Sequence, residues 1–193
     1  MKHFQIINRA DTIPLLMAIK RRPELWKEDT YLRDYPQGPF GEIESIMLRF
    51  PVKRVMETEE ELRKVDSVYD QHENIDYPAY KLLHEARPLV MGLMAQVQGE
   101  RLGRVMINKI MPGGQIFPHA DTPAHCEYYT RFHIVLYGQP GAILMCGDDD
   151  NGHEQIEMRT GDVFWFNNAL MHSVINNSAE ERISMVVDIR TSR

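Results

Sequence analysis

Apolar and polar residues alternate along most of the second half of the chain, in short segments separated by Gly, Pro, Asn and Asp. Alternation of this kind is typical of β-strands with one buried face, and the separating residues favour tight turns. Strands at such close spacing predict a β-sandwich or jelly roll. The predicted strands span residues 105–111, 132–137, 142–146, 155–159, 163–167, 171–175 and 182–189.

The first half of the chain differs, because its apolar residues recur mainly at helical spacing. Asp11 or Thr12 can cap a first helix that has Pro14 in its first turn. Residues 80–97 carry a longer apolar repeat of three and four positions, which predicts a second helix. Pro88 lies inside this repeat, so we expect either a kink there or a first-turn position for this proline.

Three further segments of the first half have weaker patterns. Residues 46–52 predict a short strand limited by Pro51. Residues 30–41 contain Tyr, Pro and Gly and predict a loop, whereas the charged residues 57–65 predict a short surface helix.

No internal repeat or linker divides the sequence, so we expect a single domain over residues 1–193. Residues 1–100 would form its mixed helical and strand part, and residues 101–193 its β core. The fold class expected is α+β, mainly β, with N-terminal helices packed on one face of the sandwich or jelly roll.

Metal-binding side chains occur in Pro118-His119-Ala120-Asp121, just past a predicted strand and turn, and His172 adds a second imidazole from a later strand. Two histidines and one carboxylate leave half of an octahedron open, as non-haem Fe(II) oxygenases require. A His-x-acid triplet is weak evidence alone, since roughly one is expected by chance in this composition. The rival triplet is His125-Cys126-Glu127, but the strand and turn context favours His119, Asp121 and His172.

The last predicted strand has one apolar and one mixed face, and Arg182 lies on the mixed one. A guanidinium group at the mouth of a barrel is costly unless it meets an anion. Arg131 and His133 alternate along another predicted strand and therefore point to the same side. We infer that these three side chains face one cavity and form a receptor for a dicarboxylate.

The composition narrows the range of functions. A net charge of -6 argues against an extended nucleic-acid surface. The sequence contains no apolar run of the roughly 18 residues that a membrane helix needs, and Met1–Ala10 lacks the pattern of a signal peptide. Cys126 and Cys146 are the only cysteines, which indicates a reducing compartment. We therefore expect a cytoplasmic protein without a membrane partner; its oligomeric state is not indicated.

Several motifs resemble, in order and spacing, the aspartyl/asparaginyl β-hydroxylase family of Fe(II)/2-oxoglutarate-dependent oxygenases. The resemblance covers about residues 104–193. The motifs are Met111-Pro112-Gly113-Gly114, Phe117-Pro118-His119-Ala120-Asp121, Arg131-Phe132-His133, Gly161-Asp162-Val163-Phe164-Trp165-Phe166, the His172 segment, and Arg182 leading to Val187-Asp188-Ile189.

The resemblance implies a double-stranded β-helix, a jelly-roll or cupin-like fold, with iron at its open end. His119 and His172 match the metal-binding histidines of the family. Arg182 matches the residue that holds the far carboxylate of 2-oxoglutarate. Arg131 and His133 match a pair near the other carboxylate.

Two further positions follow from the resemblance. Asn108 falls where a small polar contact to the co-substrate occurs. Asp121 is a departure, because the vertebrate-type protein hydroxylases have no acidic residue at this position, whereas proline hydroxylases acting on the free amino acid have one. Asp121 therefore completes the metal ligand set and favours hydroxylation over halogenation.

The function expected is a dioxygenase that uses Fe(II), 2-oxoglutarate and O2 to hydroxylate a C–H bond of an amino acid, a peptide side chain or another small substrate, with release of succinate and CO2. The alternative is a cupin-type metal-binding protein, a sensor or an isomerase, that does not use 2-oxoglutarate. A dicarboxylate receptor favours the dioxygenase, since a plain cupin does not need one. A degenerate structural barrel is disfavoured by the complete set of ligands.

Overall fold

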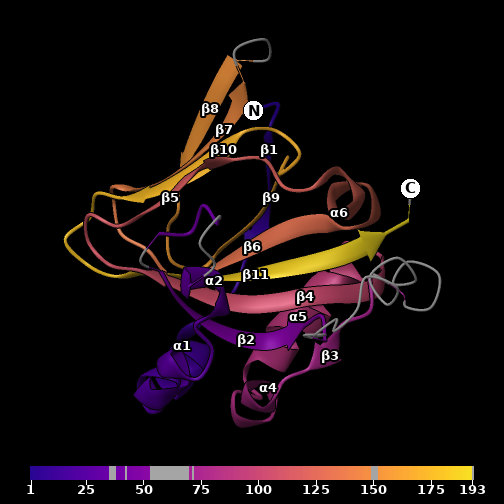
Figure 1. Cartoon of the computed structure of the whole chain (residues 1–193), viewed down its shortest axis with the longest axis vertical. Helices are drawn as coiled ribbons and strands as arrows, with labels where there is room; N and C mark the ends of the chain where they lie inside the picture. Colours follow the sequence, from indigo (N-terminus) through magenta and orange to yellow (C-terminus); the bar gives the residue numbers. More distant parts are fainter. Residues whose placement is uncertain (35–37, 42, 53–69, 71, 149–151, 193) are drawn as a thin grey trace, which may run out of the picture.

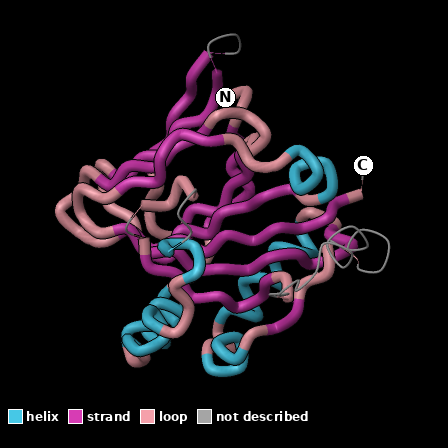
Figure 2. The backbone as a smooth tube through the Cα atoms, viewed as in Figure 1, coloured by secondary structure: helices cyan, strands magenta, loops and turns pink. Residues whose placement is uncertain are grey.

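The computed structural model describes residues 1–34, 38–41, 43–52, 70, 72–148 and 152–192. Two antiparallel sheets face each other in these residues (Figures 1 and 2). The larger sheet has the order β1 (Phe4–Arg9), β9 (Asp162–Phe166), β6 (Thr130–Tyr137), β11 (Arg182–Thr191), β4 (Gly99–Ile110), β2 (Glu44–Phe50) and β3 (Ile75–Asp76). The smaller sheet has the order β5 (Gln115–His119), β10 (His172–Asn176), β7 (Ala142–Asp148) and β8 (Gly152–Glu157).

From β4 to β11 the chain passes back and forth between the two sheets. Strands β4, β6, β9 and β11 belong to the larger sheet and β5, β7, β8 and β10 to the smaller one. This winding is that of a double-stranded β-helix, which confirms the expected fold. Because β1, β2 and β3 join the larger sheet, the first hundred residues extend the barrel wall.

The helices pack on the outer face of the larger sheet, as expected (Figure 1). They are α1 (Ile13–Lys20), the 3-10 helix η1 (Pro23–Lys27), α4 (Pro78–Leu82) and α5 (Ala86–Gln96). The apolar face of β11 lies against this helical layer, so one face of that strand is buried by helices and the other by the opposite sheet. Among the described residues, no helix has the length and apolarity needed to cross a lipid bilayer.

Two details of the predicted helices are resolved by the structure. Helix α5 begins at Ala86, so Pro88 occupies its first turn, where the missing N–H costs no hydrogen bond. Thr12 is the residue before α1, but its hydroxyl donates to the carbonyl of Leu136, while the Asp11 carboxylate accepts from the N–H of Ile13. Thr12 therefore joins the helix to the sheet instead of capping it.

Some elements differ from the sequence prediction. Short helices α2 (Tyr31–Asp34) and α6 (Pro123–Tyr128) form where loops were expected, and β1 was not predicted. The reason for β1 is its edge position, since an edge strand pairs on one side only and most of its residues stay polar or half-exposed. The predicted helix over residues 57–65 lies outside the described residues.

Candidate metal and co-substrate site

Two histidines lie directly opposite each other at one end of the smaller sheet. His119 ends β5 and His172 begins β10, in register, with ring centroids 4.2 Å apart. The Nδ1 atom of His119 lies 2.8 Å from the carbonyl oxygen of Phe117, and that of His172 lies 2.9 Å from the carbonyl oxygen of Leu170. A carbonyl only accepts, so Nδ1 carries the proton in both rings and Nε2 keeps a free lone pair.

Asp121 completes this group from the segment that follows β5. Its Oδ1 atom lies 3.9 Å from Nε2 of His119. The ligand atoms of His119, Asp121 and His172 all lie within 4.8 Å of one another, so one cation can contact all three. In the part of the chain that the structure describes, no other group of three His, Cys or acidic side chains is arranged in this way.

The charge states of these donors suit a divalent cation. Burial lowers the pKa of His172 to about 4, so its ring is neutral at physiological pH. Burial raises the pKa of Asp121, but the charge of Arg131 and the hydrogen bond from Asn168 together outweigh it, and the pKa lies below its ordinary value. The site therefore offers a neutral imidazole and an ionised carboxylate, the forms that bind metals.

Arg182 at the start of β11 is a buried cation with unused hydrogen-bond donors. Its exposed fraction is 1%, and its Nε and Nη2 atoms have no partner among the described residues. Burial lowers its pKa to about 10, so it remains charged at neutral pH. A buried charge without a partner costs several kcal/mol, so this guanidinium indicates a site for an anion.

Two further predicted residues line a small cavity that also contains the three metal donors. This inner cavity has a volume of about 80 Å³. His133 stacks on Phe164 and places Nδ1 3.1 Å from Oγ of Ser184. Burial, and then the charge of Arg182, hold the pKa of His133 well below its usual range, so its ring is neutral. The carbonyl oxygen of the Asn108 side chain accepts from the hydroxyl of Ser45, which leaves its amide nitrogen free to donate into the cavity.

Arg131 has partners that the sequence did not indicate. Its Nε and Nη2 atoms bind the two carboxylate oxygens of Asp188 at 2.8 and 3.0 Å, and its Nη1 atom lies 2.5 Å from Oδ2 of Asp121. All three guanidinium nitrogens thus contact protein carboxylates. Arg131 lines the cavity, as predicted, but it contacts the metal-site carboxylate instead of being free for a co-substrate.

The rival triplet does not form a metal site. His125 lies in α6 and places Nε2 2.8 Å from Oδ2 of Asp188, in the buried ion-pair network of Arg131. The segment after Asp121 is therefore a short helix with one side chain anchored in the barrel.

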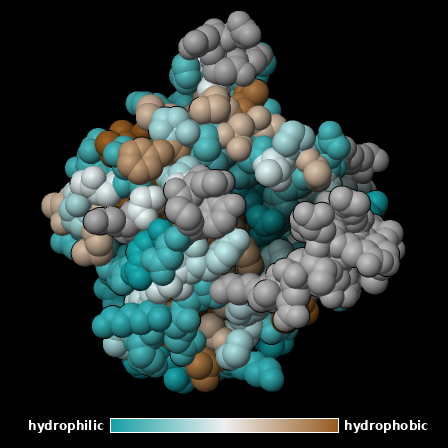
Figure 3. Space-filling model, viewed as in Figure 1, coloured by the Kyte–Doolittle hydropathy of each residue, from teal (hydrophilic) through white to brown (hydrophobic). Residues whose placement is uncertain are grey.

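A wider cleft of about 620 Å³ leads outward from the metal donors. The space-filling view shows a hollow with hydrophilic residues near the centre of this face (Figure 3). The walls of the cleft are mostly apolar and come from α2, the end of β2 and the residues after β5. Arg104 of β4 lines both the cleft and the inner cavity, and it has no hydrogen bond or ion pair to any described residue; its guanidinium lies 5.2 Å from the ring of Phe50.

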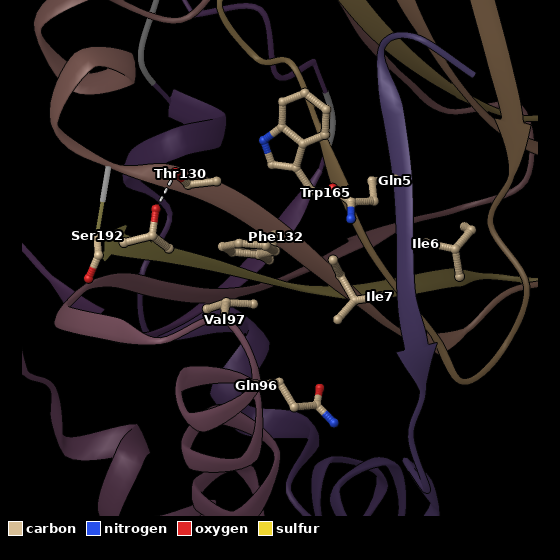
Figure 4. Close-up of a pocket in the computed structure, with 10 residues that line it drawn as sticks. Gln5, Ile6, Ile7, Gln96, Val97, Thr130, Phe132, Trp165 and Ser192 are labelled. Carbon is tan, nitrogen blue, oxygen red and sulfur yellow. Dashed lines mark hydrogen bonds between the residues drawn. The ribbon is translucent and has the colours of Figure 1, made fainter.

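A second hollow, of about 600 Å³, lies on the outer face of the larger sheet, between β1, β6, β9 and the end of α5 (Figure 4). It is lined by amide, hydroxyl and apolar side chains, including Gln5, Gln96 and Trp165. None of its lining residues is ionisable, so this hollow offers neither metal donors nor an anion anchor. The chemistry belongs to the barrel interior.

The sequence located seven residues that the structure brings around one cavity or buries beside it: Asn108, His119, Asp121, Arg131, His133, His172 and Arg182. It missed Arg104, Asn168 and Asp188. A signal existed for Asp188, which shares the mixed face of its strand with Arg182. Arg104 and Asn168 had none, because their roles depend on segments far away in the sequence.

The sheet order and the His-Asp-His group define a hydroxylase of the 2-oxoglutarate-dependent iron oxygenase class. Residues 77–192, well over half of the chain, match the aspartyl/asparaginyl β-hydroxylase family. The chain belongs to that family, and the match begins earlier than the motifs did, so that it includes α4 and α5.

Solved structures share this fold at low sequence identity. A prolyl 4-hydroxylase from Pseudomonas putida is 15% identical, with a TM-score of 0.55 over 99% of this chain and 94% of that one. A 2-oxoglutarate-Fe(II) oxygenase from Burkholderia pseudomallei is also 15% identical, with a TM-score of 0.55 over 95% of this chain and 91% of that one. A prolyl hydroxylase from Trichoplax adhaerens, solved with a peptide fragment of hypoxia inducible factor, is 11% identical, with a TM-score of 0.63 over 98% of this chain and 84% of that one. Among curated protein sequences, none matches this chain.

Proposed function

We propose that His119, Asp121 and His172 of this chain hold Fe(II), and that Arg182 binds the far carboxylate of 2-oxoglutarate. The observation that carries the proposal is the guanidinium of Arg182, which is buried, charged and without a partner at Nε and Nη2. Its charge acts on His133, which lines the cavity that contains the three metal donors. An anion in that cavity would supply the missing partner. With O2, the bound iron and 2-oxoglutarate supply the oxidant that converts a substrate C–H into C–OH, while 2-oxoglutarate becomes succinate and CO2.

The chain itself orients these groups and restricts water. Neutral His133 and the amide of Asn108 offer hydrogen bonds along the inner cavity. Apolar side chains such as Ile116, Leu144 and Val186 form the rest of its wall. Apolar walls exclude loose water, and the lower local dielectric strengthens each polar contact that a bound ligand makes with the charged and polar groups of the cavity.

The alternative, a cupin that binds a metal without 2-oxoglutarate, leaves Arg182 unexplained. A sensor or isomerase needs the metal donors but gains nothing from a buried cation without a partner. Replacing this arginine by an apolar side chain would stabilise such a protein, because it would remove an unpaired buried charge. Its presence therefore favours the oxygenase.

Arg182→Met tests the anchor, because methionine fills similar space without the charge. We expect the variant to bind Fe(II) as before but to lose at least about 100-fold in 2-oxoglutarate affinity, the equivalent of roughly 3 kcal/mol. The measurement is anaerobic titration of the Fe(II)-loaded protein with 2-oxoglutarate, followed by the visible charge-transfer band. The same substitution should leave the ligand-free protein no less stable to urea than the unchanged chain.

The control is Arg159→Met, which removes an exposed arginine that pairs with Glu157 outside the barrel. It should leave the titration unchanged. If Arg182→Met binds 2-oxoglutarate as tightly as the control, then the anchor is misassigned. If the unchanged protein shows no band at all, then the oxygenase proposal fails.

For the substrate we propose an amino acid, a peptide side chain or another small molecule with an acidic group close to the hydroxylated carbon. The support is Arg104, which has no hydrogen bond or ion pair to any described residue and faces both the cleft and the inner cavity. An anionic group of the substrate would pair with it. Succinate release should therefore be faster with free amino acids or acidic peptides than with their amides; equal rates for each acid and its amide would contradict this assignment.

We also propose a cytoplasmic location. Its support is that the two cysteines, Cys126 and Cys146, form no disulfide in the structure, which suits a reducing compartment. Isolation of the native protein with either thiol oxidised to a disulfide would argue against it.

A further inference from the structure

The two carboxylate oxygens of Asp121 have different surroundings. Oδ2 accepts a hydrogen bond from Nη1 of Arg131 at 2.5 Å and another from Nδ2 of Asn168 at 2.7 Å. Oδ1 faces Nε2 of His119. An oxygen that already accepts two strong hydrogen bonds is a poor metal donor, so only Oδ1 is left for a cation.

Asp188 binds the side of the Arg131 guanidinium that does not contact Asp121. The two side chains form a bidentate pair at 2.8 and 3.0 Å, and the exposed fraction of Asp188 is 0%. His125 adds a hydrogen bond to Oδ2 of Asp188. Because both partners are buried, the pair is poorly screened by solvent, and its planar geometry fixes the direction of the third guanidinium nitrogen. That direction is toward Asp121.

The carboxylates of Asp121 and Asp188 share the guanidinium of Arg131, and the charge of Arg104 acts on both of them. Asp188 occupies two of the three guanidinium nitrogens of Arg131, so one is left for Asp121. Without Asp188, Arg131 would have both of its terminal nitrogens available for Asp121, and it would compete with the cation for Oδ1.

We propose that Arg131 and Asp188 are positioning residues, which fix Asp121 as a one-oxygen metal ligand, and that Arg131 does not hold the co-substrate. Asn168 adds the second hydrogen bond to Oδ2, and its backbone carbonyl also accepts from the N–H of Asp121 at 3.1 Å. The inference rests on the proposed metal site. According to this inference, Asp188 affects the affinity for the metal although it does not contact the atoms that would bind the metal.

Asp188→Asn is the direct test, because it keeps the shape of the side chain and removes its charge. The affinity of the protein for Co(II), a spectroscopic stand-in for Fe(II), is measured by titration without 2-oxoglutarate. We expect it to fall by about 10- to 100-fold, as for other residues that orient metal ligands. The Co(II) absorption bands should also change in position or intensity, since the coordination of Asp121 changes. The 2-oxoglutarate affinity of the metal-saturated variant should stay within about threefold of the original.

Asp76→Asn is the matched control. Asp76 lies away from the site, and its carboxylate pairs with Arg49 at a distance of 2.6 Å. It should change neither the Co(II) affinity nor the spectrum. Since Asp188 is fully buried and its variant can fail to fold, Asn168→Ala gives a second measurement that leaves the Arg131–Asp188 pair intact. It removes one donor to Oδ2 and should also weaken Co(II) binding and alter the bands.

Three outcomes are distinguishable. If the unchanged protein fails to bind Co(II), then the proposed function itself is wrong. If it binds, and both Asp188→Asn and Asn168→Ala keep its affinity and spectrum, then only the positioning role is refuted. If a metal-saturated Arg131→Lys variant loses as much 2-oxoglutarate affinity as Arg182→Met does, then Arg131 holds the co-substrate, and the inference is overturned.

Discussion

Burial acts differently on the basic side chains inside the barrel, and the difference sets the charge of the candidate site. Imidazoles lose their proton when they are desolvated, so burial lowers the pKa of His172 to about 4 and holds that of His133 well below its usual range. The guanidinium of Arg182 keeps its proton, since burial lowers its pKa only to about 10. At neutral pH the site therefore combines the neutral ring of His172, which can bind a metal, with the fixed positive charge of Arg182, which can bind a carboxylate.

This difference predicts that the metal-free protein loses stability on mild acidification. His133 and His172 have pKa values in the folded state below the value of about 6.5 in an unfolded chain, so the unfolded state takes up more protons as the pH falls below 6.5. Stability is complete above pH 6.5, and between pH 7 and pH 5 we expect a loss of about 2 kcal/mol or more. Urea unfolding at the two pH values measures it.

His133→Gln should reduce the loss of unfolding free energy between the two pH values, because it removes one of the two histidines with a lowered pKa. His84→Gln changes an exposed histidine and is the control, in which this loss should be unchanged. Equal slopes for all three proteins would show that the buried histidines do not cause the loss.

The candidate metal donors and Arg182 could be predicted at this scale, because each is a polar or charged side chain in or beside a predicted strand, where burying it without a partner is unfavourable. Arg131 shows the limit of such reasoning. Its strand and face were predicted, but its partners depend on Asp188 and Asp121, which come from two other segments. Resemblance to a family transfers a position reliably, while the contact made there depends on neighbours such as Asp121 that vary within the family.

At the scale of elements, the strands were predicted well because their repeat of two residues and the turn residues between them can be recognised from neighbouring positions alone. Strands β6, β9, β10 and β11 lie where the pattern placed them. Strand β1 was missed since it is held by backbone pairing to β9, a contact that side-chain periodicity does not report. Helix α6 was missed because it has only six residues and is fixed by tertiary hydrogen bonds, from His125 to Asp188 and from Tyr129 to the carbonyl of His72.

Substitution by alanine should have opposite effects on stability at two glycines, Gly92 and Gly138. Gly92 lies inside α5, and a Cβ atom there would meet nothing within 4 Å. Gly92→Ala should therefore stabilise the protein by about 0.5–1 kcal/mol, because alanine loses less backbone entropy in a helix. At Gly138 a Cβ atom would overlap the carbonyl oxygen of Met158, so Gly138→Ala should cost about 1–3 kcal/mol. Thermal unfolding of the two variants checks both signs, and a stabilised Gly138→Ala would contradict the close backbone approach.

At the scale of the whole molecule, each of the two sheets contributes a different set of residues to the site. His119 and His172 belong to the smaller sheet, through β5 and β10, whereas Arg182, His133 and Asn108 belong to the larger one, through β11, β6 and β4. In the proposed site, the histidines of the smaller sheet hold the metal together with Asp121, which follows β5, and the residues of the larger sheet hold the organic acid. Neither sheet forms the site alone, which is why its assembly could not be derived from any single segment of sequence.

Because of this division, the packing between the two sheets limits the length of the acid that can bind. A dicarboxylate that binds the metal at one end and Arg182 at the other must bridge the gap, and apolar side chains such as Val174 and Val186, packed in the core between the sheets, set its width. In the proposed site, the length of the acid that fits therefore depends on these apolar residues as well as on the groups that bind its two carboxylates. Selectivity among acids of different chain length is thus a property of how tightly the barrel is packed.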